Sequence, residues 1–329
     1  MKKILQKLFE QQVLDRKEAK KILGQISEGK FNEYQVASFL TVFKMRSITV
    51  EELSGFSDCL KERCNKIDFS DFDIIDLCGT GGDGKDTFNI STLASFVVAG
   101  AGYKVAKHGN YGVSSVCGSS NVLESLGYNF TVDPDKLKNQ LSNCNITFLH
   151  APLFHPAMKE VAPIRKKLGL STFFNMLGPM VNPSFPKNQL VGVFSLQLQR
   201  YYKYIYETQD VSYRIVHSLD GYDELSLTGK AKVISPTKEY LFDPKEEMNI
   251  SITSDEILGG TSIDEAKNIF KNIISGNGTA AQNAVVCSNA ALAIQCFNPS
   301  KTFAEAREEA SESLNSKKAL HSLNKLLSI

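Results

Sequence analysis

The chain has 329 residues, of which 37 are basic and 36 acidic, so its formal net charge is +1. This length allows one large domain or two, and the balanced charge excludes a global attraction to nucleic acid or to an anionic membrane. The seven cysteines are odd in number and scattered without C-x-x-C pairs, which favours free thiols over disulfides or a zinc site. No signal-peptide pattern stands at the N-terminus and no apolar run approaches roughly 18 residues, so we expect a cytoplasmic protein without a membrane partner.

Residues 1–66 carry apolar side chains at helical spacing and predict an all-helical segment. Asp15 with Glu18 has the capping-box pattern, and so has Thr49 with Glu52. The apolar content exceeds what four short helices usually bury alone. One hypothesis is therefore a dimer surface, and the alternative is a simply packed helical subdomain.

From Phe72 onward, short apolar runs alternate with helical patterns. The predicted strands are residues 74–77, 103–106, 146–149, 190–194 and 214–218. The predicted helices between them are residues 93–99, 121–126, 134–142 and 198–207. This alternation indicates an α/β fold with a largely parallel sheet, in which ligands collect at the carboxyl ends of the strands.

A glycine-rich stretch, residues 79–84, follows the first strand and precedes a helix whose expected N-cap is Ser91 or Thr92. Backbone amides of such a stretch and of a helix N-terminus suit a phosphate. A dinucleotide-binding loop is disfavoured because the helix begins late and no acidic residue stands near Tyr103. A nucleotide-triphosphate loop is disfavoured because Asp86 stands where a hydroxyl should hold magnesium. The third interpretation is a loop for a phosphorylated sugar.

Two further segments favour anions or metals. Residues 107–115 follow a strand and combine a lysine with glycines and hydroxyls, and Ser119 stands near the start of the next helix. Asp223 and Glu224 follow another strand, where adjacent carboxylates are good magnesium ligands. Each feature alone would ordinarily be a solvated surface group, but together they indicate a ligand site.

Residues 155–167 predict one helix, on which His155 and Arg165 are ten residues apart and therefore roughly 80° apart around the axis. They could face one cleft, and the fork of an arginine suits a planar carboxylate.

The remaining chain predicts antiparallel strands, two long helices and a tail. The strands are residues 230–235 and 239–242. Ser262 caps a helix that ends at Gly276, and Thr279 opens a buried alanine-rich helix. The residues from Thr302 onward predict a solvated helix pair.

The combined motifs resemble those of the anthranilate phosphoribosyltransferases, in order and spacing, over nearly the whole chain. The motifs are residues 79–83, 89–92, 107–110, 155–158, 174–179 and 223–224. The resemblance implies a small helical domain, residues 1–70 with a returning segment at about 160–185, and a larger α/β domain formed by the rest of residues 71–329. It also implies a mostly parallel central sheet, an active site in the cleft between the domains and a homodimer through the N-terminal helices.

The resemblance further implies roles for individual residues. Phosphoribosyl pyrophosphate would contact Gly79, Gly82, Asp83, Thr87, Asn89, Ile90, Ser91, Thr92, Lys107, Ser115 and Ser119. Magnesium, as two ions, would be held by Ser91, Asp223 and Glu224. Anthranilate would contact Gly79, His108, Asn110, His155 and Arg165. The implied catalytic set is Lys107, Asn110, Arg165, Asp223 and Glu224. Three positions depart from the family pattern, namely Tyr111, Asn121 and Ser171.

The implied reaction is transfer of the phosphoribosyl group to the amine of anthranilate, a step of tryptophan biosynthesis that releases pyrophosphate. One alternative is a nucleoside phosphorylase of the same architecture, which would need no Asp-Glu metal pair. Another is a non-catalytic relative that binds nucleic acid, which should carry a basic stripe. The balanced charge argues against this second alternative.

Overall fold

The computed structural model describes residues 1–112 and 116–329. A seven-stranded sheet in the order β3-β2-β1-β4-β5-β6-β7 forms its centre. The strands are β1 (Ile74–Gly79), β2 (Lys104–Gly109), β3 (Ile146–His150), β4 (Asn188–Gly192), β5 (Ser212–Ser218), β6 (Ala231–Ile234) and β7 (Glu239–Phe242). The first five pair in parallel, whereas β6 and β7 pair antiparallel. The predicted mostly parallel sheet is thus confirmed.

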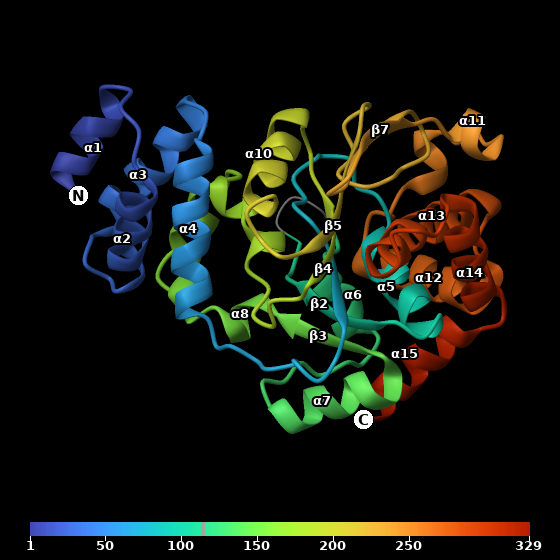
Figure 1. The fold of residues 1–329 in the computed structure, drawn as a ribbon. Helices are drawn as coiled ribbons and strands as arrows, with labels where there is room; N and C mark the ends of the chain where they lie inside the picture. Colours follow the sequence, from blue (N-terminus) through green and yellow to red (C-terminus); the bar gives the residue numbers. More distant parts are fainter. Residues whose placement is uncertain (113–115) are drawn as a thin grey trace.

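Four N-terminal helices lie apart from the sheet, at the left of Figure 1. They are α1 (Lys2–Phe9), α2 (Arg16–Ser27), α3 (Glu33–Met45) and α4 (Val50–Arg63). Both predicted capping boxes are formed, and Asn32 accepts a hydrogen bond from the backbone N–H of Gln35 as the cap of α3. The predicted helical segment is confirmed, and its boundaries follow these local caps.

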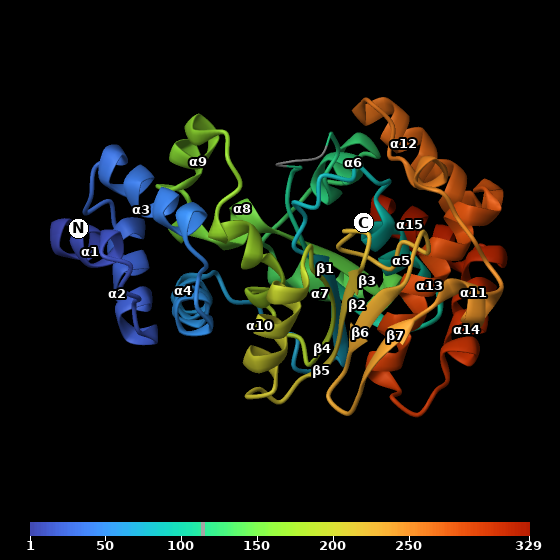
Figure 2. The ribbon, with the colours of Figure 1, turned by 90° about the horizontal axis from the view of Figure 1, so that it is seen from above.

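Helices cover both faces of the sheet (Figures 1 and 2). They are α5 (Ile90–Gly100), α6 (Ser119–Ser125), α7 (Pro134–Cys144), α10 (Leu196–Tyr206), α12 (Ile263–Asn272), α13 (Ala280–Phe297), α14 (Phe303–Asn315) and α15 (Lys318–Ser328). Short helices are α8 (Ala151–Phe154), η1 (Pro156–Met158), α9 (Ala162–Leu168), η2 (Phe173–Met176), η3 (Gly178–Met180), α11 (Pro244–Met248), η4 (Ser254–Ile257) and the π-turn η5 (Ile273–Asn277).

The two faces of the sheet belong to two hydrophobic cores. Leu190 of β4 and Val216 of β5 point into the core formed with α5 and α13. Their neighbours Val191 and Ile215 point into the core shared with α10 and the N-terminal helices. This alternation follows from the two-residue period of a strand, so each of the two strands contributes to both cores.

The segment after β3 packs against the N-terminal helices. The ring of Phe173 stacks on Phe56 of α4, with the ring centroids 4.3 Å apart, and meets Phe39 and Phe43 of α3 edge-on. Val161 belongs to the same buried cluster. Residues 157–181 therefore share a core with helices that lie far from them in the sequence.

Three local predictions are wrong. Helix α5 begins at Ile90, so its N-cap position is Asn89 rather than Ser91 or Thr92. Residues 155–167 do not form one helix, because prolines at 156 and 163 divide the segment into η1 and α9. The C-terminal helices are a pair, as predicted, but they are not simply solvated: Ala310, Leu314 and Leu323 are buried against α5 and α13.

Among the helices of the described residues, none is both long and apolar enough to cross a membrane.

Candidate active site

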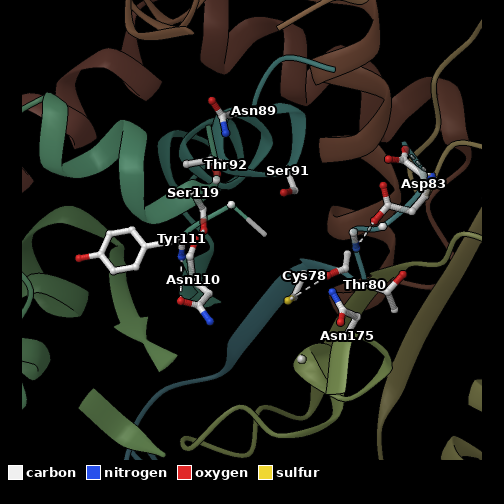
Figure 3. A pocket seen from close by; sticks show the side chains of 18 of the residues that line it. Cys78, Thr80, Asp83, Asn89, Ser91, Thr92, Asn110, Tyr111, Ser119 and Asn175 are labelled. Atoms are coloured by element: carbon white, nitrogen blue, oxygen red, sulfur yellow. Dashed lines mark hydrogen bonds between the residues drawn. The ribbon is translucent and has the colours of Figure 1, made fainter. Parts of the chain in front are cut away.

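A cavity of about 280 Å³ lies at the carboxyl ends of β1 and β2. Fourteen of the predicted site residues line it: Gly79, Gly82, Asp83, Thr87, Asn89, Ser91, Thr92, Lys107, His108, Asn110, Ser119, Arg165, Asp223 and Glu224. Figure 3 shows Ser91 and Thr92 above the cavity, Asn110 and Tyr111 on one side and Asn175 below. Segments far apart in the sequence therefore converge on one space.

Two further predicted residues lie elsewhere than expected, and a third is not described. Ile90 is 1% exposed and packs in the hydrophobic core. His155 is 4% exposed and lies behind His108, with the ring centroids 5.1 Å apart. Ser115 falls outside the described residues.

The glycine-rich loop is a tight turn that runs along the cavity. Gly81, Gly82 and Gly84 have φ angles of 61°, 78° and 70°, a region that disfavours other residues. The N–H of Thr80 donates to the carbonyl of Gly192 over 2.9 Å, and the N–H of Gly81 donates to the Asp223 carboxylate over 2.7 Å. The loop is thereby fastened to β4 and to the segment after β5.

The start of α5 supplies polar groups next to a buried cation. Asn89 occupies the N-cap position, and its side chain makes no capping hydrogen bond. Ser91 and Thr92 therefore lie inside the helix, and their hydroxyls are not used as caps. The Lys107 ammonium is 3.4 Å from Ser91 Oγ and donates to the carbonyl of Leu77. Lys107 is only 2% exposed, and a desolvated ammonium beside a helix N-terminus strongly favours an anion.

Asp223 and Glu224 face this cation across the end of the sheet. Burial, together with the negative charge of Asp83, raises the pKa of Asp223 to about 7. Burial, together with the charge of Asp223, raises the pKa of Glu224 well above its ordinary range. Within the described chain, Glu224 Oε2 is buried and has no hydrogen-bond partner. Crowded carboxylates with a free buried oxygen fit a divalent cation, which would relieve their repulsion.

In residues 1–112 and 116–329, no three His, Cys, Asp or Glu side chains converge so that they could hold a metal by themselves. Two carboxylates and a hydroxyl are a usual protein contribution to a magnesium ion that also binds phosphate oxygens and water.

Arg165 and His108 form another part of the cavity lining. One guanidinium nitrogen of Arg165 donates to Asn175 Oδ1 over 3.0 Å, and the group lies 5.2 Å from the centre of the Phe174 ring. Burial lowers the pKa of Arg165, and its Nε is buried without a partner among the residues described. This part of the lining thus offers a cation and an aromatic ring together.

The two histidines are neutral. Burial, with the proximity of His155, lowers the pKa of His108 to about 3, and burial lowers that of His155 to about 4. Nδ1 of His108 is 3.0 Å from the carbonyl of Gly178, which can only accept, so Nδ1 carries the proton. His108 Nε2 is then an unprotonated acceptor, and it has no partner in the part of the chain that the structure describes.

The three residues that depart from the family pattern each form hydrogen bonds with other residues of the chain. The hydroxyl of Tyr111 donates to Glu124 over 2.7 Å, and Lys44 donates to Ser171 over 3.1 Å. Asn121 accepts from the N–H groups of Gly112 and Gly118, over 2.9 and 3.0 Å. Asn121 thereby ties together the two sides of the loop after β2.

Two residues to which the sequence assigned no role stand at the site: Asn175, which belongs to the motif at residues 174–179, and Gly192, which belongs to none. Asn175 lines the cavity and orients Arg165. Gly192 ends β4, where a Cβ atom would collide with the carbonyl oxygen of Asp223. A glycine at the end of an apolar run signals a close approach of another backbone, but it does not tell which one.

Comparisons with known proteins agree with this geometry. The α/β domain model of a glycosyl transferase family matches residues 71–320, and the helical bundle domain model of the same family matches residues 2–64. An anthranilate phosphoribosyltransferase from Flavobacterium johnsoniae is 59% identical, covering 99% of this chain and 98% of the relative. One from Bacteroides thetaiotaomicron is 52% identical, covering 100% and 99%.

Solved structures are also similar. The anthranilate phosphoribosyltransferase from Thermus thermophilus has a TM-score of 0.88 and 28% identity, covering 98% of each chain. The enzyme from Saccharomyces cerevisiae in complex with PRPP and Mg has a TM-score of 0.89 and 26% identity, covering 98% of this chain and 96% of that one. The same yeast enzyme has also been solved in complex with 4-fluoroanthranilate. With two-domain coverage, high identity over full length and a cavity built from the expected motifs, this chain belongs to the anthranilate phosphoribosyltransferase family.

Proposed function

We propose that the protein transfers the phosphoribosyl group from 5-phosphoribosyl 1-pyrophosphate to the amine of anthranilate, as a step of tryptophan biosynthesis. The observation that carries this proposal is the cavity itself. Its lining joins a glycine loop, a helix N-terminus and buried Lys107 to a carboxylate pair, and it also includes Arg165 beside an aromatic ring. A diphosphorylated sugar fits the first group of residues and an aromatic carboxylate fits the second.

In this proposal the phosphate-binding residues act through neutral donors and one cation. The backbone of Gly79 and Gly82 and the side chains of Thr87, Asn89, Ser91 and Thr92 line the cavity. Asp83, Lys107 and Ser119 complete the surface toward the sugar phosphate. Ser115 and Ile90 remain proposed contacts, Ile90 through its backbone.

Ser91, Asp223 and Glu224 would hold magnesium, which we propose binds as two ions. When bound, the metal neutralises negative charge on the pyrophosphate. The unpartnered Oε2 of Glu224 and the mutual repulsion of Asp83 and Asp223 support this assignment.

Anthranilate would lie between Arg165, Asn110 and His108, with its carboxylate on the guanidinium. His155 would act from behind His108. Both histidines are neutral at physiological pH, and His108 Nε2 can accept a hydrogen bond from the amine. Because an aromatic amine is already unprotonated at neutral pH, the site needs to orient it rather than to deprotonate it.

The chemical step then depends on electrostatics and positioning. The C1–O bond to pyrophosphate breaks with its electron pair on the leaving oxygen, while the amine nitrogen forms a bond to C1 and then releases one of its two protons to water. Lys107 and the amides of the glycine loop stabilise the charge that develops on the leaving pyrophosphate. Arg165 and Asn110 hold the amine in line with C1, which lowers the entropic cost of the reaction.

The assembly and its location are also proposals. We propose a cytoplasmic homodimer formed through the N-terminal helices, which expose Phe9, Tyr34 and Met45. We further propose that residues 1–70 and the returning segment 160–185 form one domain and the rest of residues 71–329 the other. The core that Phe173 shares with Phe56 supports this division.

Loss of anthranilate fluorescence tests the function directly. Protein, magnesium, phosphoribosyl pyrophosphate and anthranilate together should consume anthranilate, and omitting either magnesium or the sugar phosphate should stop the loss. Phosphorolysis of nucleosides in place of this reaction would identify a nucleoside phosphorylase. Absence of both reactions in folded protein would overturn the proposed function.

A further inference from the structure

A side chain of α13 holds the backbone directly after the Asp223–Glu224 pair. Asn289 Oδ1 accepts from the N–H of Leu225 over 3.1 Å, and Asn289 Nδ2 donates to the carbonyl of Leu225 over 2.9 Å. Nδ2 also donates to the carbonyl of Val285, one turn earlier in α13, over 2.9 Å. The amide of Asn289 thus pairs with both backbone groups of one residue, as a neighbouring strand would.

Other contacts confine the same segment. Ser218 Oγ donates to the carbonyl of Glu224 over 2.6 Å. The carbonyl of Asp223 packs so closely against Gly192 that a Cβ atom on that residue would collide with it. A cavity of about 10 Å³ beneath the pair is lined by Asn289, Ser91 and Glu224 among others.

The segment needs such restraint because its carboxylates lie close together and repel one another. Asp83, Asp223 and Glu224 repel one another, which disfavours the conformation in which all three are ionised. No cationic side chain bonds Asp223 or Glu224 among the contacts of the described residues. The restraint therefore comes from neutral groups, and Asn289 is 3% exposed on α13, a largely buried helix.

We propose that Asn289 is a positioning residue, which fixes the backbone at Leu225 and thereby the direction of the Glu224 and Asp223 carboxylates toward the metal. This inference rests on the proposed function, since it takes the pair to be the magnesium ligands. Outer partners of metal ligands commonly change metal affinity about 10- to 100-fold when they are removed.

The test compares Asn289→Ala with Gln295→Ala. Gln295 lies on the same helix, is 5% exposed and donates from its amide to the carbonyl of Lys301 over 2.9 Å, away from the cavity. Both variants remove a buried amide from α13, which makes three side-chain hydrogen bonds in Asn289 and one in Gln295, so a general loss of stability should appear in both. Asn289→Asp, which keeps the shape of the side chain, serves if Asn289→Ala does not fold.

Two readouts do not depend on turnover. Hydrogen exchange in metal-free protein measures protection of the Leu225 amide, and electron paramagnetic resonance with Mn²⁺ and phosphoribosyl pyrophosphate measures metal affinity. We expect Asn289→Ala to lose the Leu225 protection and to weaken Mn²⁺ binding about 10- to 100-fold. Gln295→Ala should leave both unchanged while lowering Tm.

The proposal is overturned if folded Asn289→Ala protein binds Mn²⁺ as tightly as the original protein, whatever its Tm. Asp223→Asn separates this failure from failure of the metal assignment. If Asp223→Asn weakens Mn²⁺ binding and Asn289→Ala does not, the positioning role is wrong although the metal site stands. If Asp223→Asn has no effect either, the metal assignment itself is wrong, and the positioning role is wrong with it.

Discussion

At the scale of single residues, Arg165 on one hand and Asp223 with Glu224 on the other are charged groups that lack a partner of opposite charge among the described contacts. Arg165 has a neutral partner in Asn175 and a ring beside it, but no carboxylate bonds its guanidinium among the described residues. Asp223 and Glu224 are buried beside other negative charge. Both features leave binding capacity for a ligand of opposite charge.

Arg165→Ala should raise KM for anthranilate by roughly 10- to 100-fold, because a hydrogen bond to a charged group contributes about 1.5–3 kcal/mol. KM for phosphoribosyl pyrophosphate should change little. Steady-state kinetics with each substrate varied in turn measure both constants. Lys166→Ala, at the exposed next position, is the control and should behave as the original protein. An effect confined to phosphoribosyl pyrophosphate would contradict the assigned role.

The pH dependence of stability should report on Asp223. Its pKa rises from 3.8 to about 7 on folding, so between these values the folded state binds more protons than the unfolded state. The stability that this group contributes to metal-free protein is therefore complete below about pH 4 and falls as the pH rises to about 7. As the pH rises from about 4 to about 7, the Tm of the original protein should fall relative to the Tm of Asp223→Asn. Parallel melting curves for the two proteins at every pH would show that Asp223 does not titrate there.

Protons and metal should compete at the same carboxylate. Mn²⁺ affinity in the presence of phosphoribosyl pyrophosphate should therefore weaken as the pH falls below about 7.

At the scale of elements, a short backbone ladder holds the glycine-rich loop from outside the sheet. The N–H of Phe88 donates to the carbonyl of Ile257 over 3.2 Å, and the N–H of Gly259 donates to the carbonyl of Asp86 over 2.8 Å. Between them, Thr87 and Leu258 form an antiparallel bridge. Asp86 adopts a positive φ of 49°, a strained conformation that this ladder helps to maintain.

Gly259→Ala should disturb this ladder, because the new Cβ would lie 2.5 Å from the carbonyl oxygen of Thr87. The loop must then shift, and kcat/KM for phosphoribosyl pyrophosphate should fall roughly 10- to 100-fold, as small misplacements in active sites do. Leu258→Ala is the matched control, since the bridge uses only backbone atoms and the Leu258 side chain is 47% exposed. Equal kinetics for both variants would rule out a positioning role for the ladder.

At the scale of the whole molecule, the N-terminal helices keep apolar side chains in contact with solvent. Tyr34 is 76% exposed and Met45 is 81% exposed, although the same helices contribute to a well-packed core. An exposed apolar surface on a helical bundle is suited to bind a second copy.

The protein should sediment as a dimer at micromolar concentration, and Met45→Glu combined with Phe9→Glu should shift it toward the monomer. A buried charge at such an interface is costly because it lacks a partner. Leu241→Glu, which changes an exposed apolar residue of β7 instead, should leave the dimer intact. A monomeric original protein at micromolar concentration would remove the proposed assembly.

Local sequence was sufficient for much of the fold. Capping boxes at Asp15 and Thr49 and the apolar runs of β1 to β5 predicted elements that the structure contains, because caps and periodicity act over a few residues. The family followed from motif order, and the comparisons confirm it. Local prediction was wrong where competing signals stood close together, as at the prolines that interrupt residues 155–167.

Only the tertiary structure could show which backbones meet. Gly192, Asn289 and Gly259 look like ordinary residues of a strand, a buried helix and a loop, yet each lies against a segment that belongs to the site. Their partners lie far away in the sequence, so no local pattern identifies them. The raised pKa of Asp223 likewise depends on burial and on Asp83, 140 residues earlier. Residue types and their spacing in the sequence were sufficient to predict the kind of ligands that this site binds. Its geometry depends on packing between segments that are distant in the sequence, and a single sequence does not show which segments meet.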